Sequence, residues 1–239
     1  MGVKGWWRVP KVSAAHKEAR REHLLACAER VFLRLGYRRA RLQDVMDEAG
    51  VSRGSLYDYF SSKQELFEAV RARRDAHSLA RLHEIARGEE PVTLFVVVWT
   101  SRDDVPDEEA VAFITALLEY NLEERQNPAY RAQAKERLET FTGALTAVLE
   151  AGVRRGEFTP KLSLAAIARF LIAAQDGAAL GRLVLGDAFR AEDSYAQGLS
   201  FFARESLGIA PRRSKRHHPG GDAAMPAAAS SANGEEDVR

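Results

Sequence analysis

The sequence predicts an all-α protein in which a three-helix helix-turn-helix head precedes a larger helical body. Two observations support this prediction. Apolar side chains recur at spacings of three and four residues over most of residues 17–208, which is the period of one buried helix face. Glycine, serine and proline interrupt that pattern at positions that suit helix ends. We therefore expect several helices joined by short connections.

The first predicted helix covers the segment HKEARREHLLACAERVFLRLGY, and Gly36 provides its stop signal. Its apolar residues share one face: Leu24, Leu25, Ala28, Val31, Phe32 and Leu35. Cys27 is the only cysteine of the chain and lies in the same stretch. A single cysteine excludes an internal disulfide, and its apolar surroundings favour a small buried side chain over a nucleophile.

The next two helices form the helix-turn-helix. In RLQDVMDEAG the apolar residues follow the spacing i, i+3, i+4, i+7 from Leu42, and Gly50 ends the helix. Ser52 is placed to cap a short helix from Arg53 to about Phe60, with Leu56 as an apolar anchor. Two short helices separated by a break that contains glycine are typical of this motif.

A longer helix is predicted from Ser62 to Gly88. Ser62 and Glu65 match the S-x-x-E capping box, in which the two side chains satisfy N–H groups at a helix start. The apolar positions of this helix continue through Leu66, Phe67, Val70, Leu79, Leu82 and Ile85. Its length suits a connection between the head and the body.

The body continues in helical segments. Residues 92–99 (VTLFVVVW) are ambiguous, because valine and aromatic residues favour a strand locally. A lone strand in a helical chain has no partner, so we expect a helix there. Further helices are expected within residues 107–126, 129–156, 163–186 and 191–208.

Four parts follow from these segments. We expect a flexible N-terminal arm over residues 1–16, the head over 17–64, a larger helical body over 65–208, and a disordered tail over 209–239. The arm has no periodicity, and Trp6 and Trp7 are expected to dock locally. The tail is rich in alanine, proline, glycine, serine and charge. Its basic run RRSKRHH is interpreted as solvated, with added phosphate affinity as the alternative.

The charge is unevenly distributed. Residues 1–74 hold 16 Lys and Arg against 9 Asp and Glu, a balance of +7, whereas the remainder holds 19 against 25, a balance of −6. A basic segment joined to an acidic body indicates that the first part meets a polyanion. A solvated basic surface is the alternative reading.

The short third helix presents an unusual outer surface. Arg53, Ser55, Tyr57, Asp58 and Tyr59 point away from the predicted core, where a solvent-facing helix usually carries Glu, Lys and Gln. Tyrosine, serine and arginine suit a DNA groove, since they contact phosphates, sugars and base edges. Tyr57 is alternatively part of the core, and Asp58 is alternatively a solvated charge or a salt-bridge partner.

Lys63 begins the following helix. Its charge and the free N–H groups near Ser62 make this helix start a candidate phosphate anchor. An ordinary surface lysine is the alternative, although a cation at a helix start is electrostatically unfavourable without an anion nearby.

The stretch DVMDEAGVSRGSLYDYFSSKQELFEAV resembles the N-terminal signature of the TetR family of bacterial transcription regulators. The signature is matched at Ala49, Gly50, Val51, Ser52, Gly54, Leu56, Tyr57, Phe60, Ser62, Lys63 and Leu66. The resemblance is dense over about residues 20–70 and looser up to 208. It implies an all-helical homodimer that binds a palindromic operator in double-stranded DNA and releases it when a small molecule enters the body.

The resemblance also implies DNA contacts at Gln43, Arg53, Ser55, Tyr57, Asp58, Tyr59 and Lys63. One departure concerns the start of the second helix, where the family commonly has a capping serine or threonine and this chain has Ala40-Arg41-Leu42. Either Arg41 contacts a phosphate directly, or the helix begins elsewhere.

The body offers candidate ligand contacts. Its aromatic residues suit an apolar pocket, and polar residues in apolar helical stretches need partners that a ligand can supply. We expect ligand contacts from Phe95, Trp99, Phe113, Glu119, Tyr120, Phe141, Gln175 and Asp176, with plain core packing, salt bridges or a dimer interface as the alternatives. The apolar helix within 163–186 and the last helix are the expected dimer seam.

Several function classes are disfavoured. The sequence has no glycine-rich phosphate loop, no H-E-x-x-H and no cysteine–histidine cluster at metal-ligand spacing, so we expect neither an enzyme nor a cofactor or metal. No membrane span or signal peptide is evident, so a cytoplasmic protein is expected. The predicted function is a dimeric, ligand-released repressor. The alternatives are an activator or ligand-independent regulator on the same fold, or a nonspecific DNA-coating protein.

Overall fold

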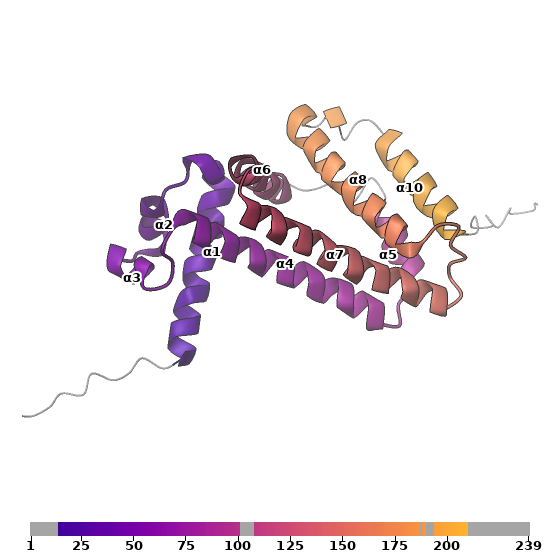
Figure 1. The fold of residues 1–239 in the computed structure, drawn as a ribbon, viewed down its shortest axis with the longest axis horizontal. Helices are drawn as coiled ribbons and strands as arrows, with labels where there is room; N and C mark the ends of the chain where they lie inside the picture. The colour runs from indigo at the N-terminus through magenta and orange to yellow at the C-terminus, as the bar shows by residue number, and fades with distance from the viewer. Residues whose placement is uncertain (1–13, 101–107, 187, 190–193, 210–239) are drawn as a thin grey trace, which may run out of the picture. The chain divides into compact units, whose positions relative to one another are not determined.

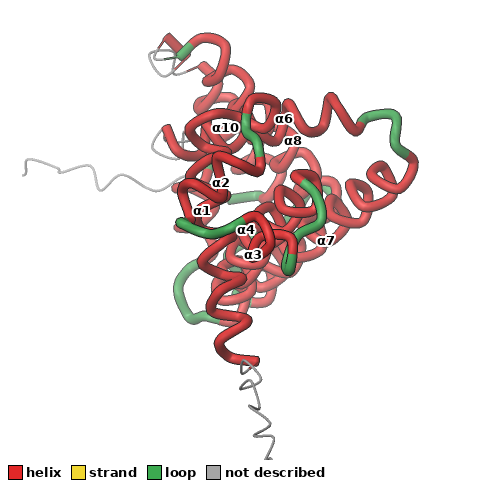
Figure 2. Tube along the Cα trace, turned by 90° about the vertical axis from the view of Figure 1, so that its left-hand side faces the viewer, coloured by secondary structure: helices red, strands yellow, loops and turns green. Residues whose placement is uncertain are grey.

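A computed structural model describes residues 14–100, 108–186, 188–189 and 194–209. Most of the predicted arm, including Trp6 and Trp7, and the predicted tail apart from Ile209 lie outside these residues. Within them the structure consists of helices and connections and contains no strand (Figure 2). All described residues belong to one unit that ends at Ile209.

The head is formed by α1 (Ala14–Arg39), α2 (Leu42–Ala49), α3 (Arg53–Tyr57) and the first turns of α4 (Lys63–Arg87) (Figure 1). Its core contains Leu24, Leu25, Phe32, Val45, Leu56, Phe60, Leu66 and Phe67. The apolar faces predicted for these helices therefore meet in one cluster. Residues 14–16, predicted as part of the arm, already belong to α1.

The first helix breaks at Gly36, as its sequence predicts, but helical structure resumes as far as Arg39. Gly36 has φ +74°, a conformation that favours glycine. A Cβ at this position would also lie 2.7 Å from Oε2 of Glu119, which accepts a hydrogen bond of 2.9 Å from the backbone N–H of Arg38. The backbone conformation therefore favours glycine here, and a larger side chain would also displace the Glu119 carboxylate.

Helix α2 begins at Leu42 without a capping hydroxyl, and Asp44 supplies the cap instead. The Oδ2 atom of Asp44 accepts a 2.8 Å hydrogen bond from the backbone N–H of Arg41. The arginine side chain has no acceptor atom, so this is half of a capping box. Gly50 ends the helix in the left-handed conformation, with φ +62°.

The two serine caps predicted at Ser52 and Ser62 are confirmed. The hydroxyl of Ser52 accepts from the backbone N–H of Ser55, and α3 ends at Tyr57, earlier than the predicted Phe60. The hydroxyl of Ser62 accepts from the backbone N–H of Glu65 at 3.0 Å. The Glu65 carboxylate binds the N–H of Ser61 rather than that of Ser62, so the capping box is shifted by one residue.

The ambiguous stretch is a helix, α5 (Val92–Trp99). Pro91 precedes it and offers no side-chain cap, and the Glu157 carboxylate takes that role by accepting from the backbone N–H groups of Val92 and Thr93 at 3.1 and 2.7 Å. Partial burial favours a higher pKa for Glu157, but these hydrogen bonds outweigh it and lower the pKa. A tertiary contact therefore fixes the start of this helix.

The body is completed by α6 (Glu108–Glu124), α7 (Pro128–Arg154), α8 (Leu164–Leu185) and α10 (Ser194–Leu207). Helix α7 lies alongside α4, and α8 lies between α7 and α10 (Figure 1). A second core lies between α5, α7, α8 and α10. It contains Val92, Val96, Leu145, Val148, Leu149, Ile167, Leu171 and Leu207. Helix α6 instead packs on α1, so it joins the head to the body.

Helix α8 differs from the other described helices in its exposed apolar surface. It is the one described helix long and apolar enough to cross a membrane on length and composition alone. It carries Arg169, Asp176 and Arg182, and 28% of its most apolar window is buried within this chain. Phe170, Leu180, Val184 and Leu185 are its exposed large apolar side chains.

Candidate nucleic-acid interface and body cavity

The outer surface of α3 exposes most of the side chains that the sequence predicts. Arg53 and Asp58 are exposed, and Tyr57 is 42% exposed, so Tyr57 is not a core residue. The Arg53 guanidinium lies 5.3 Å from the centroid of the Tyr57 ring, in a cation–π contact. Asp58 forms no ion pair within the described residues. The surface therefore presents hydrogen-bonding groups beside a tyrosine ring.

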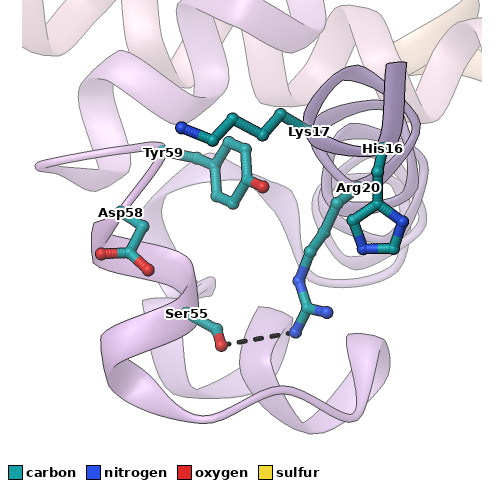
Figure 3. Close-up of a pocket in the computed structure, with 6 residues that line it drawn as sticks. All are labelled: His16, Lys17, Arg20, Ser55, Asp58 and Tyr59. Carbon is teal, nitrogen blue, oxygen red and sulfur yellow. Dashed lines mark hydrogen bonds between the residues drawn. The ribbon is translucent and has the colours of Figure 1, made fainter. Parts of the chain in front are cut away.

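Three of the predicted residues line a cleft between α3 and the first turns of α1. One wall consists of Ser55, Asp58 and Tyr59, and the other consists of His16, Lys17 and Arg20 (Figure 3). The volume of the cleft is about 520 Å³. The Nη2 atom of Arg20 donates a hydrogen bond of 3.3 Å to the hydroxyl of Ser55, and this bond connects the two walls.

The basic wall of this cleft is absent from the sequence prediction. Helical periodicity directs attention to the apolar residues of α1 from Leu24 onward, whereas His16, Lys17 and Arg20 lie within about one turn before them, and Lys17 and Arg20 continue the same side of the helix. Their clustering within one turn was the available signal. A cationic wall beside the half-buried Ser55 and Tyr59, which carry hydroxyl groups, suits a phosphate group.

The remaining predicted contacts lie at other positions in the head. Arg41 and Gln43 are exposed at the start of α2, where the Gln43 amide donates to the Asp47 carboxylate at 2.7 Å. Lys63 is partly buried. Its Nζ donates to the carbonyl oxygen of Tyr37 at 3.0 Å and lies 4.2 Å from the Tyr37 ring. Lys63 therefore ties α4 to the end of α1.

Ionic contacts hold α2, which carries the turn and α3, against α1. The Glu48 carboxylate accepts from Nε of Arg30 at 2.8 Å and from Nη1 of Arg34 at 3.2 Å. These hydrogen bonds lower the pKa of Glu48 below its usual value. The elements that position α3 are thus connected by side chains as well as by the core.

The body contains an apolar cavity of about 280 Å³ between α4, α5, α7 and α8. Its wall consists of Ser78, Arg81, Leu82, Ile85, Phe95, Trp99, Phe141, Leu145 and Ile172. The predicted ligand residues Phe95, Trp99 and Phe141 therefore meet in one place. The rings of Phe95 and Trp99 are stacked, with centroids 5.6 Å apart and planes 17° apart.

Two predicted ligand residues on α8 do not line this cavity. The Gln175 amide donates to the backbone carbonyl of Trp99 at 2.6 Å, which fastens α8 to the end of α5. Loss of water contact raises the pKa of Asp176, and the nearby Arg137 opposes that effect. Arg137 itself binds the Asp75 carboxylate through two hydrogen bonds of 2.6 and 2.8 Å.

The other three predicted ligand residues lie where α6 meets the head. Phe113 and Tyr120 are buried, and both rings contact the ring of Phe67. Phe32 and Tyr37 also contact Phe67, and Tyr130 meets Tyr120 edge-on. The Tyr120 hydroxyl donates to the Glu68 carboxylate, and burial followed by this contact raises its pKa. Glu119 binds the Arg38 backbone. These residues connect the body to the head and are remote from the cavity wall.

Comparison with known proteins agrees with this architecture. Residues 24–70 match the family model described as bacterial regulatory proteins, tetR family, and residues 101–191 match a tetracyclin repressor-like C-terminal domain. An uncharacterised HTH-type transcriptional regulator of Bacillus subtilis, YfiR, is 31% identical over 175 residues, covering 70% of this chain and 82% of YfiR.

Two further proteins extend the comparison. The HTH-type transcriptional repressor AcnR of Corynebacterium glutamicum is 28% identical over 166 residues, covering 70% of this chain and 82% of AcnR. The structure of GusR from Salmonella enterica has a TM-score of 0.63 and 21% identity, covering 83% of this chain and 100% of GusR, which establishes a shared fold. The chain belongs to the TetR family of bacterial helix-turn-helix regulators, and it is a DNA-binding regulator of transcription rather than an enzyme.

Proposed function

We propose that this chain is a dimeric repressor that binds a palindromic operator and releases it when a small molecule enters the body. The observation that carries this proposal is the exposed α3 surface beside the cationic cleft, with Tyr57 and Arg53 next to Ser55, Asp58 and Tyr59. These side chains combine base-reading and phosphate-binding groups on one helix and its neighbour.

The residues of the head take different roles in this proposal. Arg53, Tyr57 and Asp58 are exposed and face the bases, where arginine contacts guanine and aspartate accepts from cytosine. Ser55 and Tyr59 face the backbone from the cleft. Arg41 and Gln43 flank them from the start of α2. Lys63 acts mainly through Tyr37, by holding α4 against α1.

The basic wall of the cleft supplies phosphate contacts that are independent of sequence. Lys17 and Arg20 project from the first turns of α1 beside α3, and His16 lies next to them (Figure 3). Cations in this position neutralise backbone phosphates and fix the register of α3 in the groove. We therefore add His16, Lys17 and Arg20 to the DNA-binding set.

Dimerisation is proposed through α8 and α10. Their outer surfaces expose the apolar residues Phe170, Leu180, Val184, Leu185 and Phe201, of which Val184 is 70% and Phe201 68% exposed. Apolar groups this exposed, on adjacent helices, mark an interaction surface. Gly177 has open space above it and permits close helix approach, whereas Gly181 is covered by Phe189. A two-fold axis there pairs two α3 helices on one operator.

A cytoplasmic location and repression complete the proposal. Charged residues on α8 and a DNA-binding head favour a dimer helix over a membrane span, and AcnR is named a repressor. A nonspecific DNA-coating protein has no sequence preference. Sequence-selective DNA binding therefore distinguishes the proposed repressor from a DNA-coating protein.

The experiment is selection of genomic fragments with the full chain, followed by a gel shift. We expect a fragment with an inverted repeat to be enriched and to shift in the presence of excess random DNA. Enrichment of no fragment over random DNA contradicts the proposal.

A further inference from the structure

The wall of the body cavity has one charge, and that charge is positive. Of the described residues that line it, Arg81 is the only charged one, and Ser78 is the only other polar one. Both lie on α4 three residues apart, so they share one side of the helix. The rest of the wall is aliphatic or aromatic. The cavity therefore has a polar side and an apolar side.

We propose that this cavity binds a small aromatic carboxylate, with its ring against Phe95, Trp99 and Phe141 and its carboxylate at Arg81 and Ser78. This inference rests on the proposed function, because it names the effector class of a ligand-released regulator. Flat rings suit a wall that already holds stacked aromatic side chains.

The polar side of the cavity favours an anion. Arg81 forms no hydrogen bond or ion pair within the described residues, and no carboxylate is among the described lining residues. A guanidinium group binds a carboxylate through two parallel hydrogen bonds. The Ser78 hydroxyl can donate a third. A cationic ligand would meet Arg81 without a compensating acid.

The volume of the cavity suits a ligand of one or two rings. The cavity measures about 280 Å³, close to the lower end of the roughly 300–1,000 Å³ range of small-molecule pockets. One or two fused rings fit this volume, and the carboxylate then lies at the open side, where Ser78 and Arg81 are exposed. The proposed class is therefore a benzoate- or naphthoate-sized acid.

The test is isothermal titration calorimetry of the full chain with 1-naphthoate, with the neutral near-isostere 1-naphthamide, and with acetate. We expect naphthoate to bind more tightly than naphthamide and acetate to give no binding heat. Arg81→Gln should weaken naphthoate binding about fivefold, the scale of an exposed ion pair, and change naphthamide binding less than twofold.

Arg87→Gln is the matched control, because Arg87 is exposed on the same helix and does not line the cavity. It should change neither affinity. Equal binding of acid and amide, or no effect of Arg81→Gln, overturns the assignment of an anion. Absence of binding by both naphthalene compounds overturns the aromatic ligand class.

A gel shift of the same preparation without ligand separates this inference from the proposed function. A selective shift with no naphthoate binding means that the ligand class is wrong and the regulator stands. Loss of the selective shift counts against the regulator proposal, whatever the calorimetry gives.

Discussion

Leu56→Ala should destabilise the head and displace the DNA-binding surface. Helix α3 spans only Arg53–Tyr57, and a helix of this length is not stable without tertiary packing. Leu56 is its one buried residue and is fully buried in the first core, together with Phe32 and Phe60. The position of α3 therefore depends on this side chain.

The expected magnitude follows from that burial. Replacing a fully buried leucine by alanine costs about 2–5 kcal/mol, because transfer free energy is lost and a cavity remains. We expect about 3 kcal/mol for Leu56→Ala, since helices packed on both sides restrict collapse of the site. Operator affinity should fall as well, because α3 is positioned in a smaller fraction of molecules.

The assay is urea unfolding followed by circular dichroism at fixed protein concentration, which matters for a dimer. Leu122→Ala is the matched control, because Leu122 is 55% exposed on α6, and a change within about 0.5 kcal/mol is expected there. A loss below about 1 kcal/mol for Leu56→Ala, with an unchanged denaturant slope, refutes the role given to this side chain.

Three further predictions concern α5, the cleft and the dimer. Glu157→Gln should lower the melting temperature at pH 7, and the difference from the unchanged protein should shrink as pH falls below about 4. The lowered pKa of Glu157 means that its stabilisation is present above that pH and is lost as the carboxylate is protonated. A pH-independent difference contradicts this. Lys17→Ala should weaken binding to all DNA sequences and reduce the salt slope by about one, whereas Lys135→Ala should not; equal slopes argue against a phosphate contact. Phe201→Glu should give monomers in sedimentation velocity. Leu94→Glu, which also replaces an exposed apolar residue, should leave the dimer intact. A dimer in both variants would show that the interface lies elsewhere.

The head was largely predictable from sequence because its signals are local. Ser52, Gly50 and Ser62 cap or end helices through neighbouring backbone groups, and Leu56 marks the buried side of α3 by spacing alone. The exposure of Tyr57 follows from the same spacing. Helix caps and helix ends of this kind depend only on residues a few positions apart in the sequence.

The body was less predictable because its decisive contacts join distant residues. Glu157 caps α5 from the connection that follows α7, so nothing within residues 92–99 resolves their helix–strand ambiguity. Phe113 and Tyr120 have the same local pattern as Phe95 and Trp99, yet they pack against the head. Helical periodicity gives the buried face of a helix but not the element that covers it.

The central claim is that the outer surface of α3 reads a specific operator. The most direct measurement is a competition gel shift of Tyr57→Ala on the selected operator and on random DNA, with Tyr57→Phe alongside. Because Tyr57 is 42% exposed, its removal should leave the unfolding midpoint nearly unchanged. We predict that Tyr57→Ala weakens operator binding about tenfold, within the range for loss of a base contact, and leaves binding to random DNA nearly unchanged. Unchanged operator binding, or an equal loss on both DNAs, would contradict the assignment of α3 as the reading surface.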